Sequence, residues 1–326
     1  MNSGPRWEPE ASPAPPAAPQ PMRLGQVLEV GVRILRRQWP TVLIVALLIA
    51  GPGALLSSAT GLRFTQVATD ILGIEAGLVD ADTTITQAEL ERALDALVPY
   101  LLATVIAGVL LSIGTLVLSA VVAEDYHARS PHLGGVLRRG LRRAPSAIGF
   151  IILTSLITIG VILVGLLGMS AATLVFPTAS VTAGGPGVFL ALVMGVGMVV
   201  ALVYLTMRWA PAFPAMVEED LGVREAFRRS WQLSGDNVWR ILFIIVLASL
   251  TAAIGASVLS QLFALVLVEG LAPLLGLDEG VAETVAIALG SILLAPLLPV
   301  LTAVLYFDLR ARRDPATPAA QPGIER

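Results

Sequence analysis

Long apolar runs separated by short polar segments dominate the pattern of this 326-residue chain. A helix needs about 20 mostly apolar residues to cross a hydrocarbon core about 30 Å thick. Six continuous runs meet this requirement, and none alternates in the way that a membrane β-strand does. The pattern therefore predicts an all-α integral membrane protein, with transmembrane helices at about Thr41–Ser58, Pro99–Ala123, Ala147–Phe176, Gly187–Val217, Ile241–Val268 and Ala282–Phe307.

Proline interrupts the first and the last of these runs. Gly51-Pro52-Gly53 lies inside the first run, and Pro296 and Pro299 lie inside the last. Proline lacks a backbone N–H and clashes with the carbonyl one turn earlier, so a kink or a broken helix is expected at both places.

Arginine placement predicts the orientation of the spans. All basic residues are arginine, and only Arg63 and Arg92 fall in the loops on one side, which leaves 19 of the 21 on the other side. Cytoplasmic loops carry the excess of basic residues. Both termini are therefore expected in the cytoplasm, with the protein in the inner membrane of a bacterium.

The two ends of the chain differ from its centre. Residues 1–22 are rich in proline and lack the apolar core of a signal peptide, and residues 314–326 are similar. We therefore expect two disordered cytoplasmic tails around one six-span membrane domain at residues 23–313.

Composition supports the membrane assignment. Charged residues make up 14% and hydrophobic residues 56% of the chain, and the mean hydropathy is +0.81. A soluble domain carries about 25% charged residues, so a soluble globular enzyme is excluded. The absence of cysteine excludes a disulfide scaffold.

Three basic amphipathic segments each precede an odd-numbered span. They begin at Leu24, Leu133 and Leu221, and each has an apolar face opposite an arginine face. Such helices lie in the headgroup boundary and bind anionic lipid. The expected partners are anionic lipid headgroups and a possible protein at the cytoplasmic face, not nucleic acid. The candidate contact residues are Arg33, Arg36, Arg37, Arg138, Arg139, Arg142, Arg143, Arg224, Arg228 and Arg229.

These segments suggest an internal repeat. The second span ends in LSAVVAEDYHAR and the sixth in LTAVLYFDLRAR, which aligns Asp125 with Asp308 and Arg129 with Arg312. We predict three repeats of an interfacial amphipathic helix followed by a two-span hairpin. The alternative is that the positive-inside rule alone places a basic helix at each cytoplasmic entry.

Few residues suggest catalysis or metal binding. His127 and His132 share one loop but provide too few ligands for a structural metal site. Residues 80–89 have the wrong spacing for a calcium loop; Thr86 and Glu89 instead form the capping box of a helix. No cofactor motif is present, and the near absence of charge inside the spans argues against an ion-coupled transporter.

Two segments carry a resemblance to a known family. The first begins at Ala226 and reads AFRRSWQLSGDNVWR, and the second begins at Leu305, reads LYFDLRAR and has the form L-Y-x-D-L-R-x-R. Together they resemble the bacterial glycerophosphoryl diester phosphodiesterase membrane-domain family, over about residues 22–313. The motif residues interpreted as structural are Ser230, Trp231, Trp239, Arg240, Tyr306, Asp308, Arg310 and Arg312.

The resemblance implies a fold and a membrane location. No His-Arg-Gly segment or paired metal-binding carboxylates of the phosphodiesterase domain occur in the chain, so hydrolase activity is not expected. Asp308 is expected to pair with an arginine, and Trp231 and Trp239 to anchor the membrane boundary. Asp236 or Asn237 is expected to cap the fifth span.

Two functions agree with this sequence. The first is a non-catalytic scaffold that organises lipids or a partner through the arginine-rich face. The alternative is a transporter or flippase-like passage for a lipidic or neutral molecule; an intramembrane enzyme ranks last because too few titratable groups converge. A polar cavity at the centre of the three hairpins would favour passage, and a dry packed axis would favour the scaffold.

Overall fold

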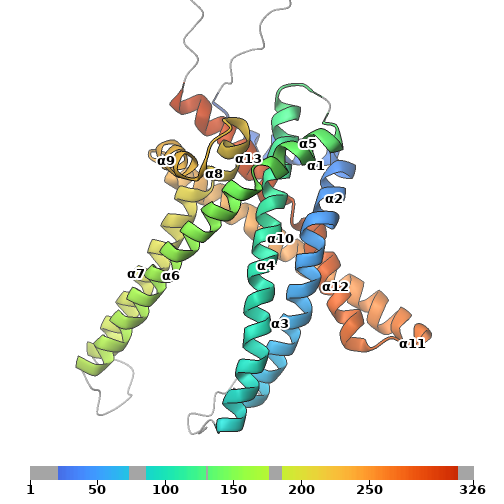
Figure 1. Ribbon diagram of the computed structural model, residues 1–326, viewed down its shortest axis with the longest axis vertical. Coiled ribbons are helices and arrows are strands. Elements are labelled where there is room, and N and C mark those ends of the chain that lie inside the picture. The colour runs from blue at the N-terminus through green and yellow to red at the C-terminus, as the bar shows by residue number, and fades with distance from the viewer. Residues whose placement is uncertain (1–20, 73–85, 130, 176–185, 315–326) are drawn as a thin grey trace, which may run out of the picture.

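All regular structure that the computed structural model describes is helical, and six segments are long and apolar enough to cross a membrane (Figure 1). The structure describes residues 21–72, 86–129, 131–175 and 186–314. The predicted tails and the loop before Thr86 lie almost wholly outside these residues. The prediction of six spans is confirmed, at Trp39–Ile71, Gln87–Tyr126, Ala144–Ala172, Pro186–Glu218, Val238–Leu275 and Glu279–Arg313.

Several spans combine more than one helix. The first span contains α2 (Trp39–Val45), the π-helix η1 (Ala46–Ala50) and α3 (Gly51–Leu72); the second is α4 (Gln87–Tyr126) and the third α6 (Ala144–Val175). The fourth contains α7 (Pro186–Trp209) and α8 (Ala212–Glu218), the fifth α10 (Val238–Ala264), the π-helix η2 (Leu265–Leu271) and α11 (Ala272–Leu275), and the sixth α12 (Glu279–Leu294) and α13 (Leu297–Arg313). The amphipathic segments form α1 (Leu24–Arg37), α5 (Leu133–Arg142) and α9 (Val223–Ser234).

Local signals explain most helix boundaries. Thr86 and Glu89 form the predicted capping box, in which each side chain bonds the backbone N–H of the other residue. Pro296 separates α12 from α13 as expected. In the turn before Pro52 the helix widens into the π-helix η1 instead of breaking, because a π-bulge accommodates the missing hydrogen bond without ending the helix.

The spans associate as three pairs that diverge from a common end (Figure 1). The pairs are α3 with α4, α6 with α7, and α10 with α12. Small residues permit close approach within a pair: a Cβ at Gly290 of α12 would lie 2.7 Å from the backbone oxygen of Ala256 on α10. Arg63 and Arg92, expected in loops, lie on α3 and α4 because both helices continue beyond the apolar run.

At the common end, α13 occupies the centre. It contacts α1, α4, α8, α9 and α10. Every residue from Pro299 to Leu309 is buried, so α13 is enclosed on all sides over three turns. A helix buried all round is typical of the core of a larger assembly of helices.

The three amphipathic helices are packed against protein at this end. Buried residues on α1 include Val27 and Ile34, and those on α5 include Val136. The sequence placed these apolar faces in the headgroup boundary, and that interpretation is wrong for their buried residues: α1 packs on α13 and α5 on α4. The ends of the spans provide an apolar surface that covers the faces more completely than lipid headgroups would.

Candidate functional site

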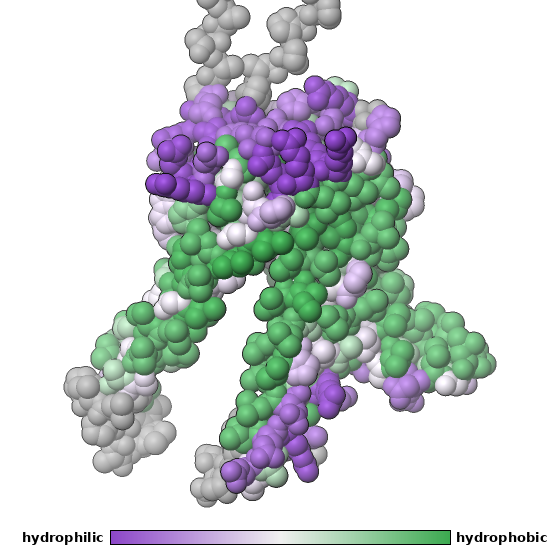
Figure 2. Space-filling view, in the orientation of Figure 1, coloured by the Kyte–Doolittle hydropathy of each residue, from purple (hydrophilic) through white to green (hydrophobic). Residues whose placement is uncertain are grey.

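The arginine residues of α1, α5, α9 and α13 lie at the common end, where hydrophilic surface gathers above the apolar helix pairs (Figure 2). We call this region the arginine-rich end. Most of its arginines are paired with carboxylates of the same chain. The candidate site is therefore a network of ion pairs together with the few arginines that the network leaves unpaired among the described residues.

Three consecutive carboxylates at the end of α8, Glu218, Glu219 and Asp220, form the main acidic group of the network. Glu218 accepts a hydrogen bond from Arg139 of α5 at 3.2 Å and lies 3.6 Å from Arg310 of α13. The His127 ring nitrogen lies 2.9 Å from the same carboxylate. Glu218 therefore joins helices that are separated in the sequence by loops and whole spans.

The other two carboxylates of this group bind further arginines. Asp220 pairs with Arg142 and Arg143, and the hydrogen bond from Arg143 holds the pKa of Asp220 below its ordinary value. Glu219 accepts a hydrogen bond from Arg229 at 2.9 Å and from the buried Tyr306 hydroxyl at 2.7 Å. A buried hydroxyl with a charged acceptor is a strong hydrogen bond, so Tyr306 connects α13 to the end of α8.

Asp308 is the most buried charge in the described residues, with a fully covered side chain. It accepts hydrogen bonds from Arg240 at 2.9 Å and from Arg312 at 3.1 Å, so its predicted arginine pairing is confirmed. It also accepts the backbone N–H of Met22 at 2.6 Å, while both arginines donate to the Met22 carbonyl. Met22, which the sequence assigned to a disordered tail, is therefore held at the start of α1.

The candidate lipid-contacting arginines divide into two groups. Arg33 pairs with Glu29, Arg37 with Asp125, and Arg139 also with Glu124; Arg229 also binds Asp314. Within the described residues, four have no ion pair and remain exposed: Arg36, Arg138, Arg224 and Arg228. Only this second group offers its full charge to an external anion.

The remaining motif residues lie around the junction of α9 and α10. The Ser230 hydroxyl donates to the Arg208 carbonyl at 2.5 Å and is fully buried. Trp239 is 82% exposed, as expected of an anchor at a membrane boundary. The predicted side-chain cap is not formed: Asn237 occupies the N-cap position without a capping hydrogen bond, and Asp236 pairs with Arg313 instead.

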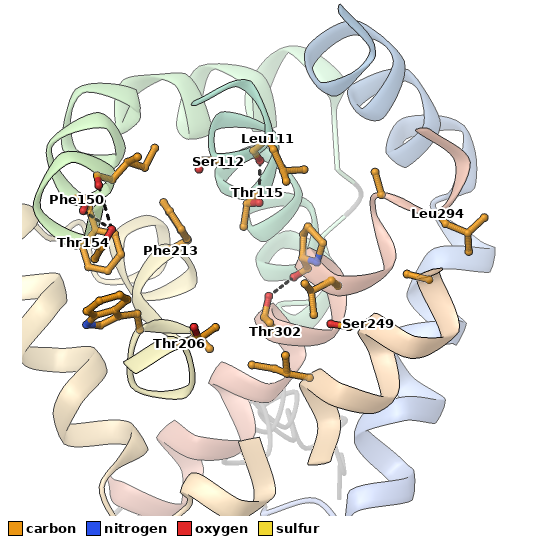
Figure 3. A pocket seen from close by; sticks show the side chains of 18 of the residues that line it. Leu111, Ser112, Thr115, Phe150, Thr154, Thr206, Phe213, Ser249, Leu294 and Thr302 are labelled. Atoms are coloured by element: carbon orange, nitrogen blue, oxygen red, sulfur yellow. Dashed lines mark hydrogen bonds between the residues drawn. The ribbon is translucent and has the colours of Figure 1, made fainter. Parts of the chain in front are cut away.

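A cavity of about 620 Å³ lies where the helix pairs meet below the arginine-rich end (Figure 3). Its lining comes from α4, α6, α7, α8, α10, α12 and α13 and is mostly apolar. Leu111 lines it and is itself 45% exposed, so the cavity is not sealed. The axis of the molecule is therefore not fully packed, but the cavity there is mostly apolar and not the polar cavity that would favour passage. The hydroxyl-bearing residues of the lining are Ser112, Thr115, Thr154, Thr206, Ser249, Ser291 and Thr302.

The polar groups of the cavity favour a mostly apolar ligand. The hydroxyls of Thr115, Thr154 and Thr302 donate to carbonyls of their own helices, so they present only acceptor lone pairs (Figure 3). Among the described residues, the indole N–H of Trp209 is buried without a hydrogen-bond partner. A buried donor without a partner is costly. The lining therefore offers a hydrocarbon-like surface with a few donors, from Trp209, Ser249 and Ser291, and several weak acceptors.

Comparison with known families bears on the second half of the chain. Residues 187–316 match the model of the family described as the membrane domain of glycerophosphoryl diester phosphodiesterase. The resemblance is confirmed over these residues. The match contains both quoted motifs and helices α7 to α13, whereas the resemblance was expected from residue 22. No curated protein and no solved structure matches the chain.

The family motifs now have a physical role in this structure. Arg240 and Arg312 come from the two motifs and meet on Asp308. Three features were not expected from the sequence: the carboxylate group at residues 218–220, the hydrogen bonds to the Met22 backbone, and the buried indole N–H of Trp209. The first of these had a visible signal, because three consecutive carboxylates in an otherwise arginine-rich segment indicate internal pairing.

Proposed function

We propose that the protein is a non-catalytic membrane protein that binds and organises lipid, with the hydrocarbon chain of a lipid in the cavity between the three helix pairs. The cavity is the observation that carries the proposal. Its volume falls within the range of about 300–1,000 Å³ typical of small-molecule sites. Its lining is apolar with few polar groups, and a wide gap separates two of the helix pairs in the space-filling view (Figure 2).

The arginine-rich end complements this cavity. Arg36, Arg138, Arg224 and Arg228 are exposed and attract anionic headgroups at a distance from the cavity. We propose that this end lies in the cytoplasm of a bacterium with both termini, that the protein lies in the inner membrane, and that the three units are repeats. The placement of 19 arginines on one side supports this orientation.

A neighbouring pair of alanines provides a matched test of the cavity. Ala252 lines the cavity, whereas Ala253 on the same helix is exposed and outside it. Vesicles of a phospholipid with a photoreactive acyl chain should label Phe150 and Ile245 in the native protein, because these two residues are buried but line the cavity. Ala252→Trp should abolish this labelling and Ala253→Trp should preserve it. Equal labelling of both variants would contradict the proposal.

Orientation has its own test, because the chain contains no cysteine. Gly134→Cys places a thiol at the start of α5, and Glu279→Cys places one at the start of α12. A membrane-impermeant thiol reagent added to intact cells should label only the second variant. Labelling of the first variant would reverse the proposed orientation.

A second function, passage of a lipid across the membrane, is favoured by one observation. A neighbouring cavity between α3, α4 and α12 shares Leu111, Ser291 and Ala295 with the first. The two together extend along the spans. Vesicles with fluorescent phospholipid in both leaflets test this function: passage exposes the inner-leaflet label to an external quencher, and binding alone does not. Lipid passage that continues in the Ala252→Trp variant would show that passage does not depend on lipid binding in the cavity.

A further inference from the structure

Arg208 is held by two aromatic residues. It lies in the last turn of α7, and its guanidinium lies 5.1 Å from the ring centre of Tyr204 and 4.8 Å from that of Trp231. Its Nε and Nη2 donate to the Tyr204 hydroxyl at 2.9 and 2.6 Å, and its Nη1 donates to the Trp231 carbonyl at 3.2 Å. The side chain is therefore held in one position by two helices.

The partners of Arg208 are all neutral. Within the described chain no carboxylate lies at ion-pair distance from it, in contrast to Arg139, Arg229 and Arg240. A guanidinium has five N–H donors, and three are engaged here. One donor on each terminal nitrogen is left, which is the arrangement that binds two oxygens of one phosphate. A positive charge near an apolar boundary is costly unless an anion joins it.

The surroundings of Arg208 extend this positive site in one direction. On α9, Arg224 and Arg228 precede Trp231 by seven and three residues, so all three lie on the same side of the helix. Both arginines are exposed and, among the described residues, have no ion pair. The positive surface therefore continues from Arg208 along α9.

In the other direction, the surface of α7 is apolar. Val196, Val200 and Tyr204 precede Arg208 at intervals of four residues and are 56%, 61% and 40% exposed. They form an exposed strip along the helix that ends at the guanidinium. A ligand that fits both directions has a phosphate at one end and hydrocarbon at the other.

We propose that Arg208, held by Tyr204 and Trp231, binds the phosphate of an anionic phospholipid whose acyl chain lies along α7. The site is outside the cavity and on a residue of a span, not of the three amphipathic arginine faces. This proposal rests on the proposed function only in that anionic lipid is present at this end. It does not require a lipid in the cavity.

Native mass spectrometry of the purified full chain tests this site. The protein in detergent is mixed with equal amounts of phosphatidylglycerol and phosphatidylcholine of identical chains, and retained lipids are counted. Loss of a bidentate charged contact should weaken phosphatidylglycerol retention by about tenfold in Arg208→Gln. Tyr204→Phe, which removes the hydroxyl that holds the guanidinium, should give a smaller loss.

Controls separate this site from general charge and from the cavity. Arg129→Gln removes an exposed arginine of the same end and should retain phosphatidylglycerol like the native protein. Ala252→Trp should also retain it, so failure of the cavity and failure of this site give different results. Native-like retention in Arg208→Gln, an equal loss in Arg129→Gln, or displacement of the lipid by inorganic phosphate alone would each overturn the proposal.

Discussion

The arginine-rich end and the α6–α7 pair are built on opposite principles. Around α13 the helices surround a buried carboxylate, a buried tyrosine and a continuous apolar core. In the most apolar stretch of the fourth span no residue is buried inside the protein, whereas in the sixth span 44% are. The first region is held by contacts within the protein, and the second is left to lipid.

This difference shows where the fold is specified and where a ligand has room. Ion pairs at the arginine-rich end connect α1, α4, α5, α8, α9, α10 and α13, so this end sets the directions in which the helix pairs leave it. Because the pairs diverge, they do not fill the space between them with side chains. The cavity is the consequence of that divergence.

Of the changes that test this comparison, removal of Asp308 should lower the free energy of unfolding the most. Asp308→Ala leaves Arg240, Arg312 and the Met22 N–H without their acceptor in a buried place, which costs about 3–5 kcal/mol of unfolding free energy. Thermal unfolding in detergent should detect this loss. Asp236→Ala removes an 82%-exposed carboxylate that also pairs with an arginine, and it should change the melting temperature little. Equal effects would show that burial of Asp308 is unimportant.

Close packing inside a pair should give the next largest effect. A methyl group at Gly290 would meet the backbone of α10, so Gly290→Ala should destabilise the protein by about 1–3 kcal/mol. Gly197 of α7 has open space at its Cβ position, and Gly197→Ala should cause no loss, since alanine favours a helix more than glycine does. The melting temperatures of the two variants measure the contrast directly.

The hydroxyl of Tyr306 should contribute less. Tyr306→Phe removes the donor to Glu219 and should cost about 1 kcal/mol. Tyr126 stacks on Phe307 at 4.1 Å between ring centres, and among the described residues its hydroxyl has no hydrogen bond. Tyr126→Phe is therefore the matched control and should leave stability unchanged. An equal loss in the control would show that the hydrogen bond to Glu219 is not what makes the Tyr306 hydroxyl stabilising.

The pairing of Asp220 with Arg143 should have the smallest effect, and it should depend on pH. Because the arginine lowers the pKa of Asp220 in the folded protein, the pairing stabilises the fold above the ordinary carboxyl pKa of about 3.9 and is lost as the pH falls through the lower folded value. The difference in melting temperature between the native protein and Asp220→Asn should be constant from neutral to mildly acidic pH. The difference should then shrink in stronger acid. A difference that grew there would contradict a lowered pKa of Asp220 in the folded protein.

Much of the helical architecture was predictable because its causes are local. Hydropathy predicted six spans, Thr86 and Glu89 predicted the start of α4, and Pro296 predicted the break before α13. Pro52 was correctly identified as a disturbance, but the structure resolves it as a π-turn. Sequence pattern alone does not distinguish these outcomes, because the packing of α3 on α4 keeps the helix in one direction.

The candidate site was predictable only in part. Asp308 was expected to find an arginine, and it binds two. The ten arginines assigned to lipid were treated as one surface, yet six of them pair with carboxylates. Which ones do so depends on where Glu218, Glu219 and Asp220 lie after folding, and no spacing in the chain reveals that.

The sequence by itself determined that the chain is helical, that it has six membrane spans and that its arginines gather at one side, because each property follows from neighbouring residues. Only the tertiary structure decided which charges meet, which apolar faces are covered and where a cavity is left. Met22 and Asp308 bond across 286 positions of the chain. Such contacts depend on the directions of whole helices, and these are set by packing at the arginine-rich end.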